Sequence, residues 1–198
     1  MKASQTAVVL IEFQNEFCSE AGRMHRAVRA ELERNGTLRN AARLLAAARE
    51  KGCLVVHCPF VFDRRWAERV CACGTLADVN EAGAFRPGEW GSELAEPFIP
   101  ARGEVVLKGK RALSGFTHTQ LDHVLAQRGI RCVACAGFLT NVCVESTARS
   151  AYDRGWRVVI VKDACGATSR ANQEYVENQI APVLGCAMSV DEFIASLE

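Results

Sequence analysis

The sequence has no excess of charge of either sign and no run of apolar residues as long as a transmembrane helix. Its 24 Lys and Arg nearly balance its 23 Asp and Glu, which leaves a formal net charge of +1. Interspersed charges of this kind do not favour nucleic acid or an acidic membrane surface as a partner. The first apolar stretch runs straight into Glu12 and has no small-residue cleavage site. We therefore expect a cytoplasmic protein that acts on a small molecule and binds neither nucleic acid nor membrane.

Two glycine signatures of nucleotide-binding folds are also missing. No G-x-G-x-x-G follows the first apolar run, and no G-x-x-x-x-G-K-[ST] occurs anywhere in the chain. A fold that holds a dinucleotide or a phosphate against its backbone amides needs those glycines. We therefore expect no nucleotide cofactor.

The cysteines lack the spacing of a metal site. The C-x-C motif Cys71-Ala72-Cys73 has His57 and Cys58 as its nearest possible partners, and these do not supply the paired C-x-x-C of a zinc site. We expect no metal. The chain has ten cysteines, and several of them, such as Cys53 and Cys135, lie in apolar runs where they act as small hydrophobic residues. This distribution favours a reducing compartment over a disulfide framework.

The sequence does contain a regular alternation of strand-like and helical segments. The β-branched run over 6–13 is typical of a strand that is buried on both faces of a parallel sheet. The alternation predicts one α/β domain over 1–198, with a doubly wound, mostly parallel six-stranded sheet, helices on both faces and a Rossmann-like three-layer architecture of strand order 3-2-1-4-5-6. The expected strands are 6–13, 53–60, 104–108, 130–137, 156–164 and 185–190, and the expected helices are 39–52, 117–129, 141–154, 170–180 and one from Asp191.

Cys143 follows a pattern that places a thiol at the start of a helix. An apolar run ends at Gly137, the chain turns through 138–141, and a helical pattern begins. Free N–H groups and the helix dipole at that position stabilise a thiolate, and the same N–H groups can hold an oxyanion. The chemistry favours a nucleophile. The alternative is that Cys143 is a small core residue, as most of the other cysteines must be.

Three residue types that could work together are expected at one edge of the sheet. Glu12 lies at the end of the first strand, Lys110 follows the third, and Cys143 lies shortly after the fourth. Ligands of doubly wound sheets bind outside the carboxyl ends of the strands, where the strand order reverses. If the order is 3-2-1-4-5-6, an acid, a base and a thiol face one crevice.

Three segments of the chain, in register, resemble a known family. They are IEFQNEF at 11–17, KRALSGFTHTQLD at 110–122 and GFLTNVCVESTARSAYDRGWRV at 137–158. Each resembles a motif of the isochorismatase-like cysteine hydrolases, in the same order and spacing, and Asp163 follows the next strand as is usual in that family. The resemblance covers nearly the whole chain.

The resemblance implies a role for each matching residue. Cys143 would be the nucleophile, Glu12 the acid and base, and Lys110 the cation that completes a triad. A cis peptide would join Phe138 to Leu139, and the backbone amides of Leu139 and Cys143 would form an oxyanion hole. The family also implies a homo-oligomer, either a dimer or a tetramer.

Neighbouring residues compete for these roles. The family usually has aspartate where this chain has Glu12, and a misplaced carboxylate can reduce activity about a hundredfold. Glu16 is a second carboxylate, which we interpret as a capping or pocket-rim residue because it lies past the strand. Lys108 is a second lysine, and the family spacing selects Lys110. His57 is expected to pack near the pocket and not to bind a metal.

The reaction that these residues imply is hydrolysis of a C–N bond through a thioester. Family members that cleave a vinyl ether commonly lack a cysteine at the position of Cys143, so its presence favours an amide, carbamoyl or ureido substrate. Nicotinamidases of the family have a D-x-H…H metal site after the second strand, where this chain has one histidine, His57.

The segment 59–103 is expected to be a long loop that covers the pocket. It shows no strong helix or strand period, and loops that follow strands commonly carry specificity. Phe60, Trp66 and Trp90 are therefore expected to line the pocket, together with Phe138. The alternative is a satellite core under the loop.

Two other functional classes remain open from the sequence. A thiol-redox or sensor protein would use Cys143 with Cys135 or Cys165 as its resolving partner, and it would not need Glu12. A binding module would keep the fold and lose activity through the change to Glu12.

Overall fold

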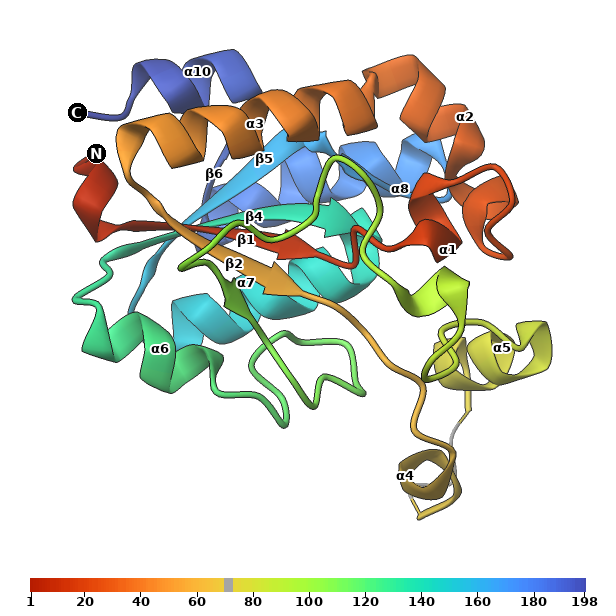
Figure 1. The fold of residues 1–198 in the computed structure, drawn as a ribbon. Coiled ribbons are helices and arrows are strands. Elements are labelled where there is room, and N and C mark those ends of the chain that lie inside the picture. The colour runs from red at the N-terminus through yellow and green to blue at the C-terminus, as the bar shows by residue number, and fades with distance from the viewer. Residues whose placement is uncertain (70–72) are drawn as a thin grey trace.

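A computed structural model describes residues 1–69 and 73–198 and contains a six-stranded parallel sheet (Figure 1). The strand order is β3-β2-β1-β4-β5-β6, which confirms the predicted 3-2-1-4-5-6 topology. β1 and β4 are neighbours in register, so the strands that lead to the two central motifs lie side by side. The strands are β1 (Thr6–Ile11), β2 (Leu54–Cys58), β3 (Val105–Val106), β4 (Cys132–Phe138), β5 (Arg157–Gly166) and β6 (Gly185–Met188).

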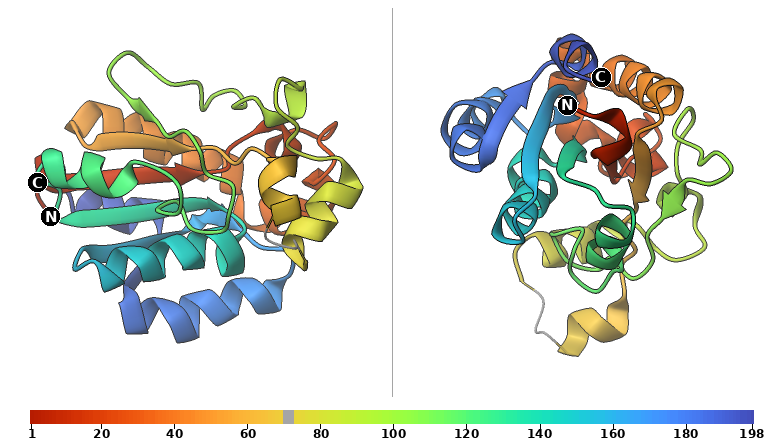
Figure 2. Two further views of the ribbon diagram at one scale, coloured as in Figure 1. Left: turned by 90° about the horizontal axis from the view of Figure 1, so that it is seen from below. Right: turned by 90° about the vertical axis from the view of Figure 1, so that its left-hand side faces the viewer.

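Helices cover both faces of the sheet and produce three layers (Figure 2). One face packs against α2 (His25–Asn35), α3 (Thr37–Lys51) and α10 (Val190–Ala195), through a core that includes Leu10 and Phe138. The other face packs against a second set of helices, through a core that includes Val9 and Cys143. All six residues of β1 are buried, as a strand enclosed on both faces requires. This second set comprises α6 (Leu121–Gln127), α7 (Glu145–Asp153), α8 (Arg170–Tyr175), the π-helical turn η4 (Val176–Ile180) and α9 (Ala181–Leu184).

The region after β1 folds into a short helix before α2. α1 (Asn15–Cys18) follows directly on Gln14, whose buried side chain exchanges hydrogen bonds of 2.8 Å with the backbone N–H and carbonyl of Phe60. The same amide donates to the carbonyl of Ser92 at 2.7 Å. Gln14 thus joins the end of β1 to two parts of the segment 59–103.

That segment differs from the predicted long loop because it contains helices. They are α4 (Arg64–Arg69), α5 (Thr75–Ala82) and the 3-10 turn η2 (Trp90–Ser92). α5 is eight residues long, and it ends at Gly83, which has the left-handed backbone of a helix stop. Helices this short span only about two turns, so they leave little periodicity in a sequence. Figure 1 shows α4 and α5 beyond the carboxyl ends of the strands.

Among the boundaries that differ from the predicted ones are those of β3 and α6. β3 has only two paired residues, where a strand was expected over 104–108. α6 begins at Leu121 and not at 117, because His118 has a left-handed φ of 62° that a helix cannot include. Thr119 Oγ1 accepts a hydrogen bond from the N–H of Leu121 and therefore supports the helix start from outside. None of the helices in residues 1–69 and 73–198 is long and apolar enough to cross a membrane.

Candidate active site

Close approach of β1 and β4 fixes the position of Glu12. Ile11, the last residue of β1, pairs with Gly137 near the end of β4. Gly137 has a φ of 130°, and a Cβ at this position would lie 1.9 Å from the carbonyl oxygen of Ile11, so the pairing requires glycine. Glu12 follows with a left-handed φ of 59°, which is rare for a residue with a side chain and is typical of functional sites.

Lys110 reaches Glu12 from the segment between β3 and α6. Lys110 Nζ donates to Glu12 Oε1 at 2.5 Å and to the carbonyl oxygen of Ala112 at 2.9 Å. Both charged side chains are buried, with exposures of 0% for Lys110 and 5% for Glu12. The ammonium group also lies 5.0 Å from the ring centre of Phe60, in a cation–π arrangement. A buried charge pair of this kind depends on these contacts to offset desolvation.

Cys143 lies in the turn that connects β4 to α7. The peptide bond between Phe138 and Leu139 is cis, and the π-helical turn η3 (Thr140–Val144) continues directly into α7. The carbonyl oxygen of Cys143 accepts a hydrogen bond from Thr147 Oγ1 at 2.7 Å. Thr147 Oγ1 in turn accepts from the N–H of Gly115 at 2.9 Å. This connection attaches the segment that carries Lys110 to the helix that carries the thiol.

The surroundings keep the thiol protonated. Burial raises the pKa of Cys143 well above its ordinary value, and the charge of Glu12 together with a hydrogen bond to it raises that pKa further. The charge of Lys110 acts in the opposite direction. The net rise means that the proton stays on Cys143 Sγ, next to a carboxylate that can receive it.

Lys110 keeps its positive charge despite its burial. Burial alone would lower the pKa of Lys110, but the charge of Glu12 and a hydrogen bond to it raise the pKa above its ordinary value. Lys110 therefore supplies a positive charge beside the carboxylate of Glu12.

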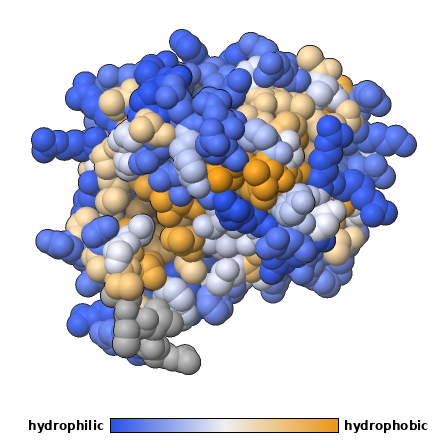
Figure 3. Space-filling view, turned by 180° about the vertical axis from the view of Figure 1, so that it is seen from behind, coloured by the Kyte–Doolittle hydropathy of each residue, from blue (hydrophilic) through white to orange (hydrophobic). Residues whose placement is uncertain are grey.

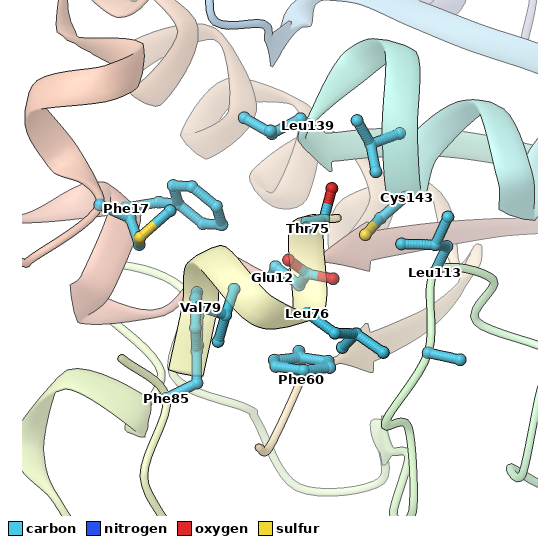
Figure 4. A pocket seen from close by; sticks show the side chains of 13 residues that line it. Glu12, Phe17, Phe60, Thr75, Leu76, Val79, Phe85, Leu113, Leu139 and Cys143 are labelled. Atoms are coloured by element: carbon cyan, nitrogen blue, oxygen red, sulfur yellow. The ribbon is translucent and has the colours of Figure 1, made fainter. Parts of the chain in front are cut away.

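An apolar cavity opens between Glu12 and Cys143. In Figure 4 both side chains point toward the same space, which side chains of α5 close from the other side. The cavity has a volume of about 40 Å³, so it can hold a group of a few atoms. Its lining residues are Glu12, Phe17, Met24, Phe60, Thr75, Leu76, Val79, Phe85, Ala112, Leu113, Leu139, Val142 and Cys143.

Of the four aromatic residues expected at the pocket, only Phe60 lies against this cavity. Trp66 packs edge-on against His118, with ring centres 5.8 Å apart. Trp90 lies in η2 and is 49% exposed, and Phe138 is fully buried in the core beneath the turn. The sequence does not determine the direction in which each of these side chains points.

The competing residues have structural contacts of their own. Glu16 is buried and accepts hydrogen bonds from the backbone N–H groups of Arg23, before α2, and Phe85, after α5, so it connects these segments to α1 and does not line the cavity. Lys108 is exposed. His57 lies within β2 and its Nε2 is 2.7 Å from Glu104 Oε2, away from the candidate site.

Other predicted cysteine and acid positions lie apart from the cavity. Asp163 accepts a hydrogen bond from the N–H of Val190 and thereby attaches α10 to β5. Cys135 and Cys165 are fully buried in the sheet. Cys71 and Ala72 of the C-x-C motif lie outside the described residues. Within the described part of the chain, no group of three or more His, Cys, Asp or Glu is arranged to hold a metal ion.

Sequence reasoning missed most of the aliphatic residues at the cavity. Leu76 and Val79 come from α5, Leu113 comes from the segment after Lys110, and Val142 directly precedes the cysteine. One signal for α5 was available, since Leu76 and Val79 are spaced i, i+3 and share a helix face. The prediction of a loop over 59–103 obscured that signal.

Comparison with known proteins identifies relatives of the whole chain. The model of the isochorismatase domain matches residues 6–192. A ureidoacrylate amidohydrolase, RutB, of Variovorax paradoxus (strain S110) is 32% identical over 212 aligned residues, which cover 99% of this chain and 82% of that protein.

Solved structures are similar over the same extent. An isochorismatase family protein from Desulfovibrio vulgaris is 27% identical, with a TM-score of 0.80 and coverage of 96% of this chain and 98% of that one. The N-carbamoylsarcosine amidase of Thermoplasma acidophilum is 26% identical, with a TM-score of 0.71 and coverage of 97% and 98%.

Proposed function

The chain belongs to the isochorismatase family, and we propose that it is a cysteine hydrolase that cleaves a C–N bond of a small amide, carbamoyl or ureido compound. One observation carries the proposal: the thiol of Cys143 and the carboxylate of Glu12 line one cavity, and the ammonium of Lys110, outside that lining, contacts the carboxylate. The names of two relatives, an amidohydrolase and an amidase, support the same reaction class.

The first half of the reaction forms a thioester. Glu12 takes the proton from Cys143 Sγ, and the thiolate attacks the carbonyl carbon of the substrate. The backbone amides of Leu139 and Cys143 donate to the oxyanion, and each such donor lowers the barrier by about 3 kcal/mol. Lys110 offsets the negative charge that forms as the proton moves. Glu12 then returns the proton to the nitrogen, the C–N bond breaks, and the amine leaves.

The second half of the reaction consumes one water molecule. Glu12 deprotonates the water, which attacks the thioester carbonyl and forms a second oxyanion at the same amides. The C–S bond breaks, the proton returns to Sγ, and the carboxylic acid departs. The net reaction converts one amide and one water into one acid and one amine, and the enzyme returns to its protonated thiol.

Two alternatives have less support. A redox sensor needs a thiol of lowered pKa, whereas burial and Glu12 raise the pKa of Cys143. An inactive binding module was suggested by glutamate in place of aspartate, yet Glu12 is long enough to contact Lys110 at 2.5 Å. A lost active site would not need to keep this buried pair.

The acyl-enzyme provides the direct test. Intact-mass spectrometry would follow the wild-type protein during turnover of a panel of small amides, ureido compounds and activated esters. We expect a transient adduct on the wild type and on the Cys186→Ala control, and none on Cys143→Ala. A panel that gives no adduct and no Cys143-dependent product, together with rapid peroxide oxidation of Cys143, would favour the redox alternative.

We also propose a cytoplasmic location and assembly as a dimer or tetramer. Large apolar side chains are exposed at several places, including Trp90, Ile99 and Val106, and Val106 lies on the edge strand β3. These exposed side chains support assembly. In Figure 3, apolar residues gather in the middle of one face among hydrophilic ones. Sedimentation velocity of the purified chain measures the assembly directly, and a monomer at micromolar concentration would contradict it.

A further inference from the structure

We infer that the substrate is an uncharged compound with a compact apolar body, and that the cavity discriminates against ureido acids and other anionic amides. This inference rests on the proposed function, because it assigns a substrate class to the same site. It is carried by the chemistry of the side chains around Cys143, most of which are hydrocarbon.

Charge at the cavity is already paired. Glu12 is the acid of the lining, and its carboxylate is in contact with the ammonium of Lys110. Among the described residues that line the cavity, none carries a positive charge. An anionic substrate group would therefore lie near the carboxylate of Glu12, whose charge is already paired with Lys110. No cation in the described lining could replace the water that the anionic group loses on binding.

Apart from the hydroxyl of Thr75, the other side chains of the lining are apolar. Phe60 and Leu113 lie on one side of the cavity, Leu139 on another, and Leu76 and Val79 of α5 close it (Figure 4). Placing a carboxylate against such side chains without a hydrogen-bond donor carries a large desolvation penalty. An alkyl group in the same place gains a favourable transfer free energy with each CH₂ that it buries. The cavity thus distinguishes two compounds of equal length by the charge at their far end.

Two matched pairs of compounds test this preference. Butyramide differs from succinamate, and propylurea from 3-ureidopropionate, by a terminal methyl in place of a carboxylate. We expect the neutral member of whichever pair is hydrolysed to have a kcat/KM at least about 100-fold higher, from the penalty for an unpaired buried charge. Equal values, or a preference for the anion with turnover still dependent on Cys143, would overturn the inference and leave the proposed function intact.

Binding supplies a readout that does not depend on turnover. Calorimetry with Cys143→Ala measures the affinity for the same four compounds, and we expect the neutral ones to bind at least about tenfold more tightly. If none of the four is hydrolysed, these affinities still decide the inference, whereas the absence of an acyl adduct decides the proposed function. Tighter binding of either anion would overturn the inference.

A charge introduced into the cavity should reverse the preference. Leu76 is partly buried and lines the cavity from α5, so Leu76→Lys places a cation within reach of a substrate carboxylate. Ala77→Lys adds the same charge to an exposed position one residue away and is the matched control. We expect Leu76→Lys to shift the anion-to-neutral ratio of kcat/KM by at least about tenfold toward the anion. An equal shift in Ala77→Lys would mean that the overall electrostatic potential of the protein, and not a charge inside the cavity, causes the effect, and it would overturn the inference.

Discussion

At the scale of single residues, the central question is whether the proton between Cys143 and Glu12 lies on the thiol or on the carboxylate. Cys143 keeps its proton because burial and the charge of Glu12 both raise its pKa, while Lys110 reduces that effect. In the free site a neutral thiol therefore lies beside a carboxylate. The thiol can transfer its proton to that carboxylate once a carbonyl is in place. In the proposed reaction Glu12 thus has two separable effects: it accepts the proton, and it suppresses ionisation of the thiol in the absence of substrate.

Glu12→Gln should separate these two effects. Loss of the negative charge removes one cause of the raised pKa of Cys143, so alkylation of Cys143 by iodoacetamide at pH 8 should become faster. Hydrolysis should fall at least about 100-fold, because the amide cannot accept the proton. Peptide mass spectrometry measures the first rate at Cys143 alone. Slower alkylation would show that Glu12 activates the free thiol.

Lys110→Met tests the buried cation. The change leaves Glu12 buried without its partner, so we expect a loss of about 3 kcal/mol in the free energy of unfolding together with loss of activity. Urea titration and steady-state kinetics measure the two effects. Lys108→Met is the matched control, because Lys108 is exposed two residues earlier. Similar losses in both variants would contradict the assignment of the cation to Lys110.

At the scale of elements, the sequence predicts the strands better than their surroundings. The buried runs at β1 and β4 are continuous and apolar, and this signal does not depend on tertiary contacts. α5 was missed because its two turns are stabilised by burial of Val79 and by the glycine stop, which are weak signals in a sequence. The expected positions of Glu12, Lys110 and Cys143 followed from strand ends and motif spacing, whereas the cavity lining depends on how α5 folds over the site.

Gly137 is the backbone position on which the site depends most. Gly137→Ala places a methyl group against the carbonyl of Ile11 in a conformation that already disfavours side chains. We expect it to destabilise the protein by about 3 kcal/mol or more, beyond the cost of ~1–2 kcal/mol for the left-handed region alone. Gly129→Ala supplies that reference, since Gly129 has a φ of 63° and open space around it. Equal changes in the free energy of unfolding would exclude a steric role.

Val79 tests α5 as a cover of the cavity. Val79→Ala removes two methyl groups from the lining and should enlarge the space beside Cys143. We expect kcat/KM to increase for amides with a longer or branched acyl chain relative to the shortest amide that is hydrolysed. Glu81→Ala changes an exposed residue of the same helix and is the control. An unchanged order of substrates would mean that α5 does not limit substrate size.

At the scale of the whole molecule, a hydrogen-bond network around His57 and Glu104 lies away from the candidate active site. The ring of His57 is buried in β2, and its Nε2–H donates to Glu104, which also accepts from Arg49 of α3. His57 Nδ1 has no hydrogen-bond partner among the described residues. Protonation would place a second N–H donor there without an acceptor. Burial is the largest cause that lowers the pKa of His57 below its ordinary 6.5, despite the opposing effect of Glu104.

This network predicts how stability falls in acid. A group whose pKa is lower in the folded state binds its proton mainly after unfolding, so its contribution is complete above the unfolded pKa and is lost as pH falls. For His57 the loss begins near pH 6.5. For Glu104, burial alone would raise the pKa, but hydrogen bonds from Arg49 and His57 lower it to about 2, so the loss of its contribution to stability begins near pH 4.5.

We therefore expect the urea midpoint to fall between pH 7 and 5.5 in the wild type and to change less in His57→Gln. His123→Gln, at an exposed position of α6, should behave as the wild type does. A midpoint that fell equally in all three proteins would assign the acid sensitivity to groups other than His57.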